Sequence, residues 1–252
     1  MGIMIKQIRQ FKAICACAVV LTMAAAGVSA VEADGKWHHE FTEDGIAVSM
    51  MTEEGRTLPA FRGVANVDAG LFEVLGMLDD AKRATEWMAN CMENKVIKQI
   101  NEFDRIIYNR TDAPWPVSDR DVVISAVVTG DAEKREVMIK FTSVTNQGPG
   151  PVDGVVRMPR LRGYYKLQAI DEKHTKVTYQ IDADSGGSLP DWLITRATRR
   201  LPVDTIAGMR SQIKKTAGNY DNFVRRYDPT KGGKIPEQFA KTPPVAPGVA
   251  QP

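Results

Sequence analysis

The stretch APWPVSDRD, residues 113–121, connects two strand-like runs near the middle of the chain. Proline fixes the φ angle and removes a backbone donor, so a loop with a proline on each side of Trp115 is stiff and cannot lengthen either strand. Its last residues, Arg120 and Asp121, return the chain to the sheet. We therefore expect Trp115 to be held on a rigid arm, as a lid over an apolar space or as a plug in the core.

Two segments of the chain resemble one known family. The segment PWPVSDRD, residues 114–121, resembles the PWP(V/M)S(N/D)RD signature of START domains, the lipid-binding family related to steroidogenic acute regulatory protein. The segment GGSLPDWL, residues 186–193, is similar to that family's G-x-LP-x-W-(L/I) start of its last helix. The resemblance covers residues 37–227 and implies an α+β helix-grip fold. In this fold a curved antiparallel sheet wraps a long C-terminal helix, with one lipid between them.

The order of the other segments agrees with such a fold. Asp68 is expected to cap a helix with Leu71, Phe72, Leu75 and Leu78 at helical spacing, and a second short helix carries Ala84 and Trp87. Asp-Gly and Glu-Gly-Arg sequences at residues 42–45 and 52–56 predict hairpin turns. About nine strands are predicted, at residues 37–41, 46–51, 58–67, 96–103, 105–108, 122–129, 136–144, 155–170 (one long strand or a bent pair, interrupted near Pro159 and Gly163) and 176–183.

The predicted final helix begins near residue 188, where Ser188 and Asp191 are spaced as a capping box. Pro202 inside it predicts a kink or a restart. Its apolar face can be plain core, but its small and flexible groups, such as Gly208, favour a cavity. That face comprises Leu189, Trp192, Leu193 and Ala197, then Ile206, Met209, Ile213, Ala217, Tyr220 and Val224; the opposite, solvent-facing side carries Arg210, Gln212, Lys214 and Lys215.

These patterns predict the wall of a ligand site. The expected contacts are Ile107, Trp115, Val122, Ile124, Ala126, Ile139, Phe141, Leu193, Ala197, Ile206, Met209 and Ile213. The steroidogenic branch of the family has an acid–base pair in its cavity, and the corresponding positions here, Ile107 and Ala126, are apolar. The resemblance therefore does not imply that this protein shares the sterol specificity of the steroidogenic branch. Arg105 is either a contact for a polar headgroup or a charge at the rim. The Trp115 loop and the helix around Pro202 are the expected moving parts.

The N-terminal 30 residues have the form of a bacterial signal peptide. Lys6, Arg9 and Lys12 precede an apolar run of about 14 residues, and the small-x-small sequence 28–30 predicts cleavage before Val31. An uncleaved anchor is the alternative. Cleavage leaves 30 of the 33 basic residues against 31 acidic ones, a net charge of −1 instead of +2. The mature protein is thus expected in the periplasm or outside the cell, with no strong electrostatic attraction to anionic membranes.

Several kinds of chemistry find no candidate residues. No basic cluster suggests nucleic-acid binding. His38 and His39 are adjacent and face opposite sides of a strand, so they cannot form a pair of metal ligands. The sequence contains neither a phosphate-binding loop nor a recognisable Ser-His-Asp or Cys-His arrangement. We expect no metal, no cofactor and no enzymatic activity. Cys91, the single cysteine after the signal peptide, is expected to be buried, and the protein to be a monomer. Residues 228–252, rich in proline and without periodicity, are predicted to be a disordered tail.

The sequence therefore predicts an exported protein, with a lipid-binding domain over residues 31–227, that holds one hydrophobic ligand. A phospholipid, a fatty acid or a sterol-like molecule would suit an internal cavity, and transfer between membranes with transient membrane contact is the expected task. Two alternatives stay open. One is a helix-grip enzyme of the cyclase or hydrolase type with a hydrophobic substrate, since fold alone does not determine activity. The other is a scaffold or sensor stabilised by its ligand.

Overall fold

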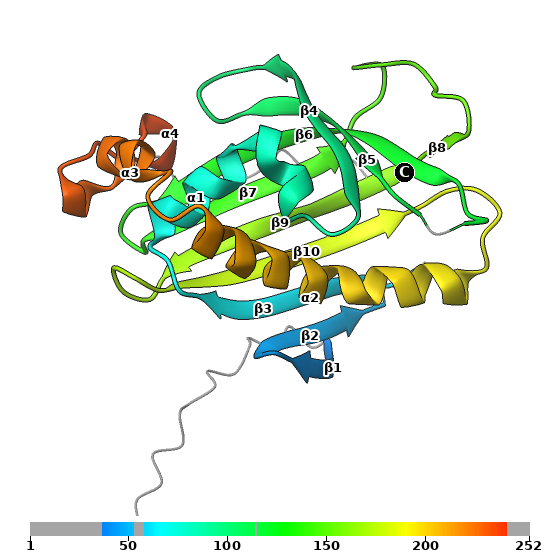
Figure 1. The fold of residues 1–252 in the computed structure, drawn as a ribbon, viewed down its shortest axis with the longest axis horizontal. Helices are drawn as coiled ribbons and strands as arrows, with labels where there is room; N and C mark the ends of the chain where they lie inside the picture. The colour runs from blue at the N-terminus through cyan, green and yellow to red at the C-terminus, as the bar shows by residue number, and fades with distance from the viewer. Residues whose placement is uncertain (1–36, 53–57, 114, 241–252) are drawn as a thin grey trace, which may run out of the picture. The chain divides into compact units, whose positions relative to one another are not determined.

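A ten-stranded sheet forms the frame of the protein (Figure 1). The structure, a computed structural model, describes residues 37–52, 58–113 and 115–240. The strands follow the spatial order β1-β2-β3-β10-β9-β7-β6-β5-β4, all antiparallel, and the short β8 pairs in parallel with β6. Their bounds are β1 (His38–Glu43), β2 (Ile46–Met51), β3 (Ala60–Val67), β4 (Cys91–Gln99), β5 (Arg105–Thr111), β6 (Asp119–Asp131), β7 (Glu136–Ser143), β8 (Val155–Arg157), β9 (Arg160–Ala169) and β10 (Thr175–Asp184).

The predicted antiparallel sheet is confirmed, with two local differences. The run predicted at residues 155–170 is a bent pair, β8 and β9, and Gly163 lies within β9 without interrupting it. The glycine is needed for close packing, since a Cβ there would stand 2.1 Å from the Gln180 carbonyl oxygen of the adjacent strand. The strand predicted at residues 96–103 instead spans Cys91–Gln99, because Asn101 starts a turn. Its side-chain oxygen accepts hydrogen bonds from the backbone N–H groups of Phe103 (3.0 Å) and Asp104 (2.8 Å).

The hairpin between β1 and β2 turns where the Asp-Gly pair predicted it. Asp44 and Gly45 both have positive φ angles, 50° and 71°. Two consecutive left-handed residues make the tight turn whose twist matches that of the flanking strands. The second predicted turn, residues 52–56, falls largely outside the described residues.

The short helices differ from the prediction in their boundaries. Helix α1 (Leu71–Asp79) begins after Gly70 and not after Asp68, because the chain first bends at Asp68 and Ala69 beside β10, where the Thr175 hydroxyl donates to Ala69 O at 2.8 Å. The second helix is a 3₁₀ helix, η1 (Ala81–Glu86), and Trp87 lies just beyond it. The remaining short helices are α3 (Asp221–Tyr227), η2 (Pro229–Lys231) and α4 (Glu237–Ala240).

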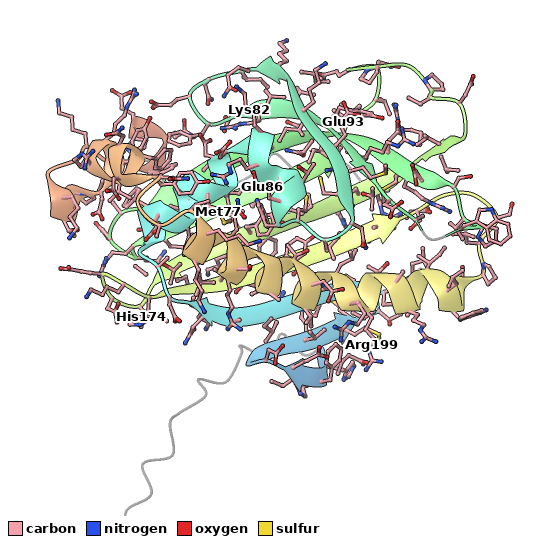
Figure 2. All side chains as sticks on the ribbon, in the orientation of Figure 1. Met77, Lys82, Glu86, Glu93, His174 and Arg199 are labelled. Carbon is pink, nitrogen blue, oxygen red and sulfur yellow. The ribbon has the colours of Figure 1, made fainter. Side chains whose placement is uncertain are left out.

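Helix α2 (Asp191–Lys215) is a single helix that crosses β10, β3 and β2 (Figure 1). The predicted restart at Pro202 is wrong, since the proline packs on the sheet: a Cβ on Gly63 of β3 would stand 2.7 Å from Pro202 Cβ. The predicted capping box is also wrong, because Pro190 is the N-cap and no side chain caps the helix. The first half of α2 reaches the β1–β2 hairpin, where Arg199 meets Glu40 at 3.3 Å (Figure 2).

The second half of α2 packs closely against the rest of the core. A Cβ on Gly208 would stand 2.0 Å from the Trp87 carbonyl oxygen, so this glycine permits a close helix approach and does not leave room for a ligand. The helix ends at Thr216, which leaves Ala217 exposed. Tyr220 is the N-cap of α3, and Val224 lies within α3. Gln212, predicted on the solvent side, is 1% exposed and donates to Glu86 at 2.8 Å. Hydrogen bonds from Arg83 and Gln212 lower the pKa of Glu86 to about 2.

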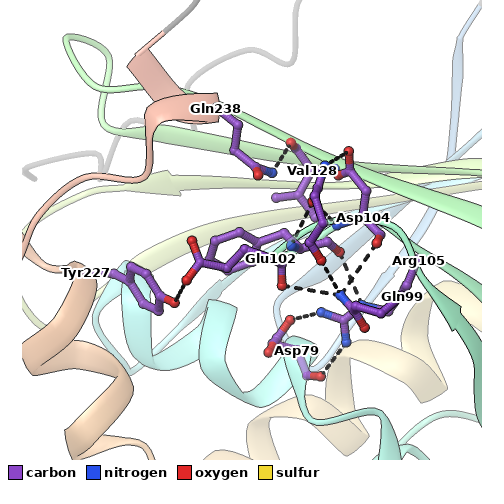
Figure 3. A network of polar contacts seen from close by, with 10 residues as sticks. Asp79, Gln99, Glu102, Asp104, Arg105, Val128, Tyr227 and Gln238 are labelled. Carbon is purple, nitrogen blue, oxygen red and sulfur yellow. Dashed lines mark hydrogen bonds and ion pairs between the residues drawn. The ribbon is translucent and has the colours of Figure 1, made fainter.

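The chain after residue 227 belongs to the domain. Phe239 is 3% exposed and its ring lies 5.3 Å from that of Phe103, in a cluster with Phe223 and Tyr227. Gln238 donates to the Val128 carbonyl oxygen of β6 at 2.8 Å (Figure 3). The predicted disordered tail is therefore wrong for residues 229–231 and 237–240. The Asp228 carboxylate caps the first segment by accepting from the Thr230 N–H at 2.9 Å, and Gln238 and Phe239 hold the second against β6 and the core. Residues 241–252 lie outside the described part.

Candidate functional site

A cavity of about 320 Å³ lies between the sheet and the first half of α2. This volume falls in the range of roughly 300–1,000 Å³ that is usual for small-molecule sites. Alternate residues of a strand point to one face, and on β6 the even-numbered residues from Arg120 to Val128 line the cavity. The remaining apolar wall comes mainly from α1, β5, β7, β10 and α2, for instance Leu75, Leu78, Ile107, Ile139, Phe141, Ile181, Leu193 and Leu201.

Eight of the twelve predicted contact residues line this cavity: Ile107, Val122, Ile124, Ala126, Ile139, Phe141, Leu193 and Ala197. They come from β5, β6, β7 and the first two turns of α2, which are far apart in the sequence and meet only in the fold. Their direct contact with a ligand stays a prediction.

Four predicted residues lie elsewhere. Ile206, Met209 and Ile213 are 0%, 0% and 6% exposed, and they pack in the core under the second half of α2, beyond the cavity. Trp115 is 92% exposed, so it is neither a plug nor part of the cavity wall. The loop turns its tip outward, while Ala113 and Val117 face the cavity.

A pair of hydrogen-bonded groups holds the base of this loop. Arg110 binds the Asp119 carboxylate at 2.5 Å, and Asp119 also accepts from the backbone N–H of Ala113 at 3.3 Å. The Arg110 hydrogen bond keeps the pKa of Asp119 below its usual value. Because both ends of the loop are tied to the same carboxylate, its turn is fixed by hydrogen bonds and not by burial of the indole.

Arg105 lies at the opposite end of the cavity and is buried, so the prediction of a rim charge is wrong (Figure 3). Its guanidinium forms an ion pair with the Asp79 carboxylate and donates to the carbonyl oxygens of Asp79 (2.9 Å) and Phe103 (3.2 Å). Burial raises the pKa of Asp79, and Arg105 opposes that rise. The charge of Arg105 is thus already matched within the protein. Contact between Arg105 and a headgroup remains a prediction.

Sequence reasoning missed several polar groups of the wall. The alternation that places Arg105 and Ile107 on the cavity side of β5 also places Asn109 and Thr111 there. On β6 the same parity could have identified Arg120. No local signal marks Trp87, whose buried indole Nε1 has no hydrogen-bond partner among the described residues.

The cysteine thiol and the two stacked tyrosines of the described chain have raised pKa values. Cys91 is half-buried, Asn109 donates to its sulfur at 3.3 Å, and burial raises the pKa of its thiol, which leaves it a weak nucleophile. Burial also raises the pKa of Tyr165 and Tyr179, whose rings stack 4.6 Å apart. Among the described residues, no three His, Cys, Asp or Glu side chains are grouped to hold a metal ion. In the same part of the chain, no helix has the length and apolar character needed to span a bilayer.

Comparison with known proteins supplies the decisive observation. The model of the START domain matches residues 20–217, which is most of the chain. The chain belongs to the START domain family. This START-domain protein is 33% identical over 196 residues to an uncharacterized protein of Pseudomonas aeruginosa, covering 78% of this chain and 96% of the relative.

Solved structures agree with this membership. The crystal structure of a STAR-related lipid transfer protein from Xanthomonas axonopodis (fragment 25–204) superposes with a TM-score of 0.65 at 30% identity, covering 71% of this START-domain chain and 99% of that one. Human STARD10 superposes with a TM-score of 0.68 at 20% identity, covering 83% and 86%, which shows the shared fold. The helix-grip architecture expected from the two sequence motifs is therefore confirmed.

Proposed function

We propose that this START-domain protein holds one hydrophobic ligand in the cavity under α2 and carries it without altering it. The observation that supports this is the 320 Å³ space with its apolar wall. Each buried methylene contributes about 0.8 kcal/mol, so an acyl chain binds there with few polar contacts. A phospholipid, a fatty acid or another single amphiphile of that size suits the wall.

We further propose that the protein is exported, as the signal-like N-terminus predicts, and that it meets membranes transiently. Two large apolar side chains are exposed next to residues that line the cavity. Trp115, in the loop whose Val117 lines the cavity, is 92% exposed, and Trp192, next to the cavity-lining Leu193 at the start of α2, is 66% exposed. Indole rings favour the interface between water and lipid, where an apolar body and a polar N–H are both accommodated. The two tryptophans therefore mark the end of the protein that would touch a bilayer.

Release of the ligand requires the cavity to open, and the first half of α2 is the part suited to move. Two ion pairs tie it to the β1–β2 hairpin: an exposed one between Arg200 and Glu43 (2.5 Å), and one between Arg199 and the half-buried Glu40 (3.3 Å). Exposed pairs of this kind contribute little stability each. The second half is anchored by the close contacts at Gly63 and Gly208. Motion about Pro202 would open the cavity without disturbing the core.

Mass spectrometry of lipids extracted from the purified protein tests the proposed function. We expect one intact amphiphile for each protein molecule. Recovery of a chemically altered lipid would instead favour the enzymatic alternative. A ligand-free protein that takes up no amphiphile would favour the scaffold.

The double replacement Trp115→Ala and Trp192→Ala tests membrane contact. We expect the variant to bind amphiphiles as the original does, but to transfer them between vesicles about 10-fold more slowly, since the loss of both indole anchors weakens contact with the interface. Fluorescence transfer between labelled and unlabelled vesicles measures this rate. Ile170→Ala is the matched control, because Ile170 is 51% exposed and follows β9 at the end of that strand far from the cavity-lining Leu161. Equal rates for all three proteins would contradict the proposed contact.

A further inference from the structure

Arg120 is a buried cation in the wall of the cavity. It is 8% exposed, it lies at the start of β6 opposite Thr111 of β5, and both residues line the cavity. A Cβ placed on Gly187 would stand 3.7 Å from Nη2 of Arg120, so the guanidinium lies beside the loop between β10 and α2. This is the end of the cavity opposite Arg105.

The carboxylates on either side of Arg120 in the sequence are already bound. Asp119 and Asp121 point to the other face of β6 by strand alternation. Asp119 binds Arg110 at 2.5 Å, and Asp121 binds Arg157 at 2.6 Å and accepts from the Tyr108 hydroxyl at 3.1 Å. Each of these acids therefore has a basic partner of its own on the face away from the cavity.

Arg120 itself has no carboxylate at ion-pair distance among the described residues. Asp112, a nearby acid of the wall, is exposed to solvent and forms no ion pair with it. The guanidinium donates from Nη1 to the Ser118 carbonyl oxygen, and its buried Nε has no acceptor in the described chain. Burial lowers the pKa of Arg120, with Asp119 opposing. A buried charge of this kind is unfavourable unless something pairs with it.

The two arginines of the cavity wall are thus not equivalent. Arg105 is neutralised by Asp79, whereas Arg120 has no ion pair and a buried Nε without an acceptor among the described residues. Between them on β6 lie Val122, Ile124 and Ala126, an apolar path from residue 120 to residue 126. Six residues of strand span roughly 20 Å, which is enough for a long hydrocarbon chain.

We propose that Arg120 binds the oxyanion, carboxylate or phosphate, of an amphiphile whose hydrocarbon chain lies along Val122, Ile124 and Ala126. The planar guanidinium fork matches both oxyanions, and such charge-assisted bonds strengthen where water is excluded. This inference rests on the proposed function and gives it a ligand class: amphiphiles with an anionic oxygen group at the head.

Binding of head-matched amphiphiles to the full chain, after delipidation, tests the inference. Oleate is compared with oleyl alcohol, and lysophosphatidic acid with monooleoylglycerol, by fluorescence displacement. We expect the original protein to prefer the charged member of at least one pair by about 10-fold, as hydrogen bonds to a charged group suggest. The pair that shows the preference tells a carboxylate from a phosphate. Arg120→Gln should lose the preference while its affinity for the neutral member is unchanged.

Two further variants sharpen the result. Arg120→Lys keeps the charge without the fork and should retain part of the preference. Arg62→Gln is the matched control, because Arg62 binds Gln180 at 2.8 Å outside the cavity wall, and it should keep the original preference.

Three outcomes would overturn the inference, and they differ from one another. If charged and neutral members bind equally to the original protein, the cavity function stands and the role of Arg120 falls. If no amphiphile binds, the proposed function fails with it. If Arg120→Gln lowers Tm and weakens both members alike, Arg120 only supports the loop through Ser118.

Discussion

Tryptophan in place of Ala126 is expected to abolish amphiphile binding in a protein that still folds. Ala126 lies in the cavity wall on β6, between Arg105 of β5 and Phe141 of β7 in the strand register. An indole there would occupy the space of the ligand. Displacing about four methylenes from burial costs about 3 kcal/mol, or about a 100-fold loss of affinity. The loss should affect charged and neutral amphiphiles alike, unlike the change at Arg120.

The fold should tolerate this replacement because the added side chain enters an existing cavity of about 320 Å³ and not a filled core. Filling a cavity is commonly neutral or stabilising. Displacement of a fluorescent fatty acid measures affinity, and thermal unfolding of the ligand-free protein measures stability. Val127→Trp is the control: Val127 is 41% exposed and absent from the cavity wall, so its variant should bind normally. Normal binding by Ala126→Trp would mean that the ligand lies elsewhere.

Replacement of Asp121 by alanine is expected to cause a large loss of stability. Asp121 is 1% exposed, and its carboxylate accepts from Arg157 at 2.6 and 3.0 Å and from the Tyr108 hydroxyl at 3.1 Å. Asp121 O also accepts from the Met158 N–H at 2.9 Å, so this residue joins β6 to the segment around β8. Removing the carboxylate leaves two donors without an acceptor.

Breaking a buried ion pair on one side usually costs 3–5 kcal/mol, and since water can reach the Arg157 side chain, which is 36% exposed, we expect about 2–3 kcal/mol here. For a chain of this size that loss lowers Tm by roughly 4–12 °C. Calorimetry on ligand-free protein measures it. Asp131→Ala at the other end of β6 is the control, because its ion pair with Lys134 is on the surface and should leave Tm nearly unchanged. An unchanged Tm for Asp121→Ala would show that the buried acid contributes no net stability.

The part of the site that sequence could predict is the part carried by strands. Ile107 and Ala126 were placed by the family resemblance, and Ile139 and Phe141 by two-residue alternation. All four line the cavity, as do Val122 and Ile124 of the same predicted sheet. On the final helix the prediction held only for Leu193 and Ala197. Helical spacing identifies a buried face, but not whether that face meets a cavity or the core. The close contact at Gly208, in the second half of α2, comes from Trp87, a residue remote in the sequence.

The sequence by itself determined the START-type order of elements and the inward row on β6, because proline, glycine and alternating apolar residues act through their immediate neighbours. Only the tertiary structure decided that Trp115 points outward and that Phe239 joins the core. It also decided that Asp79 neutralises Arg105, while Arg120 has no ion pair within the part of the chain that the structure describes. The physical reason is that burial and charge pairing depend on partners brought together by folding. Asp79 lies 26 residues from Arg105, at a separation that no local pattern reports.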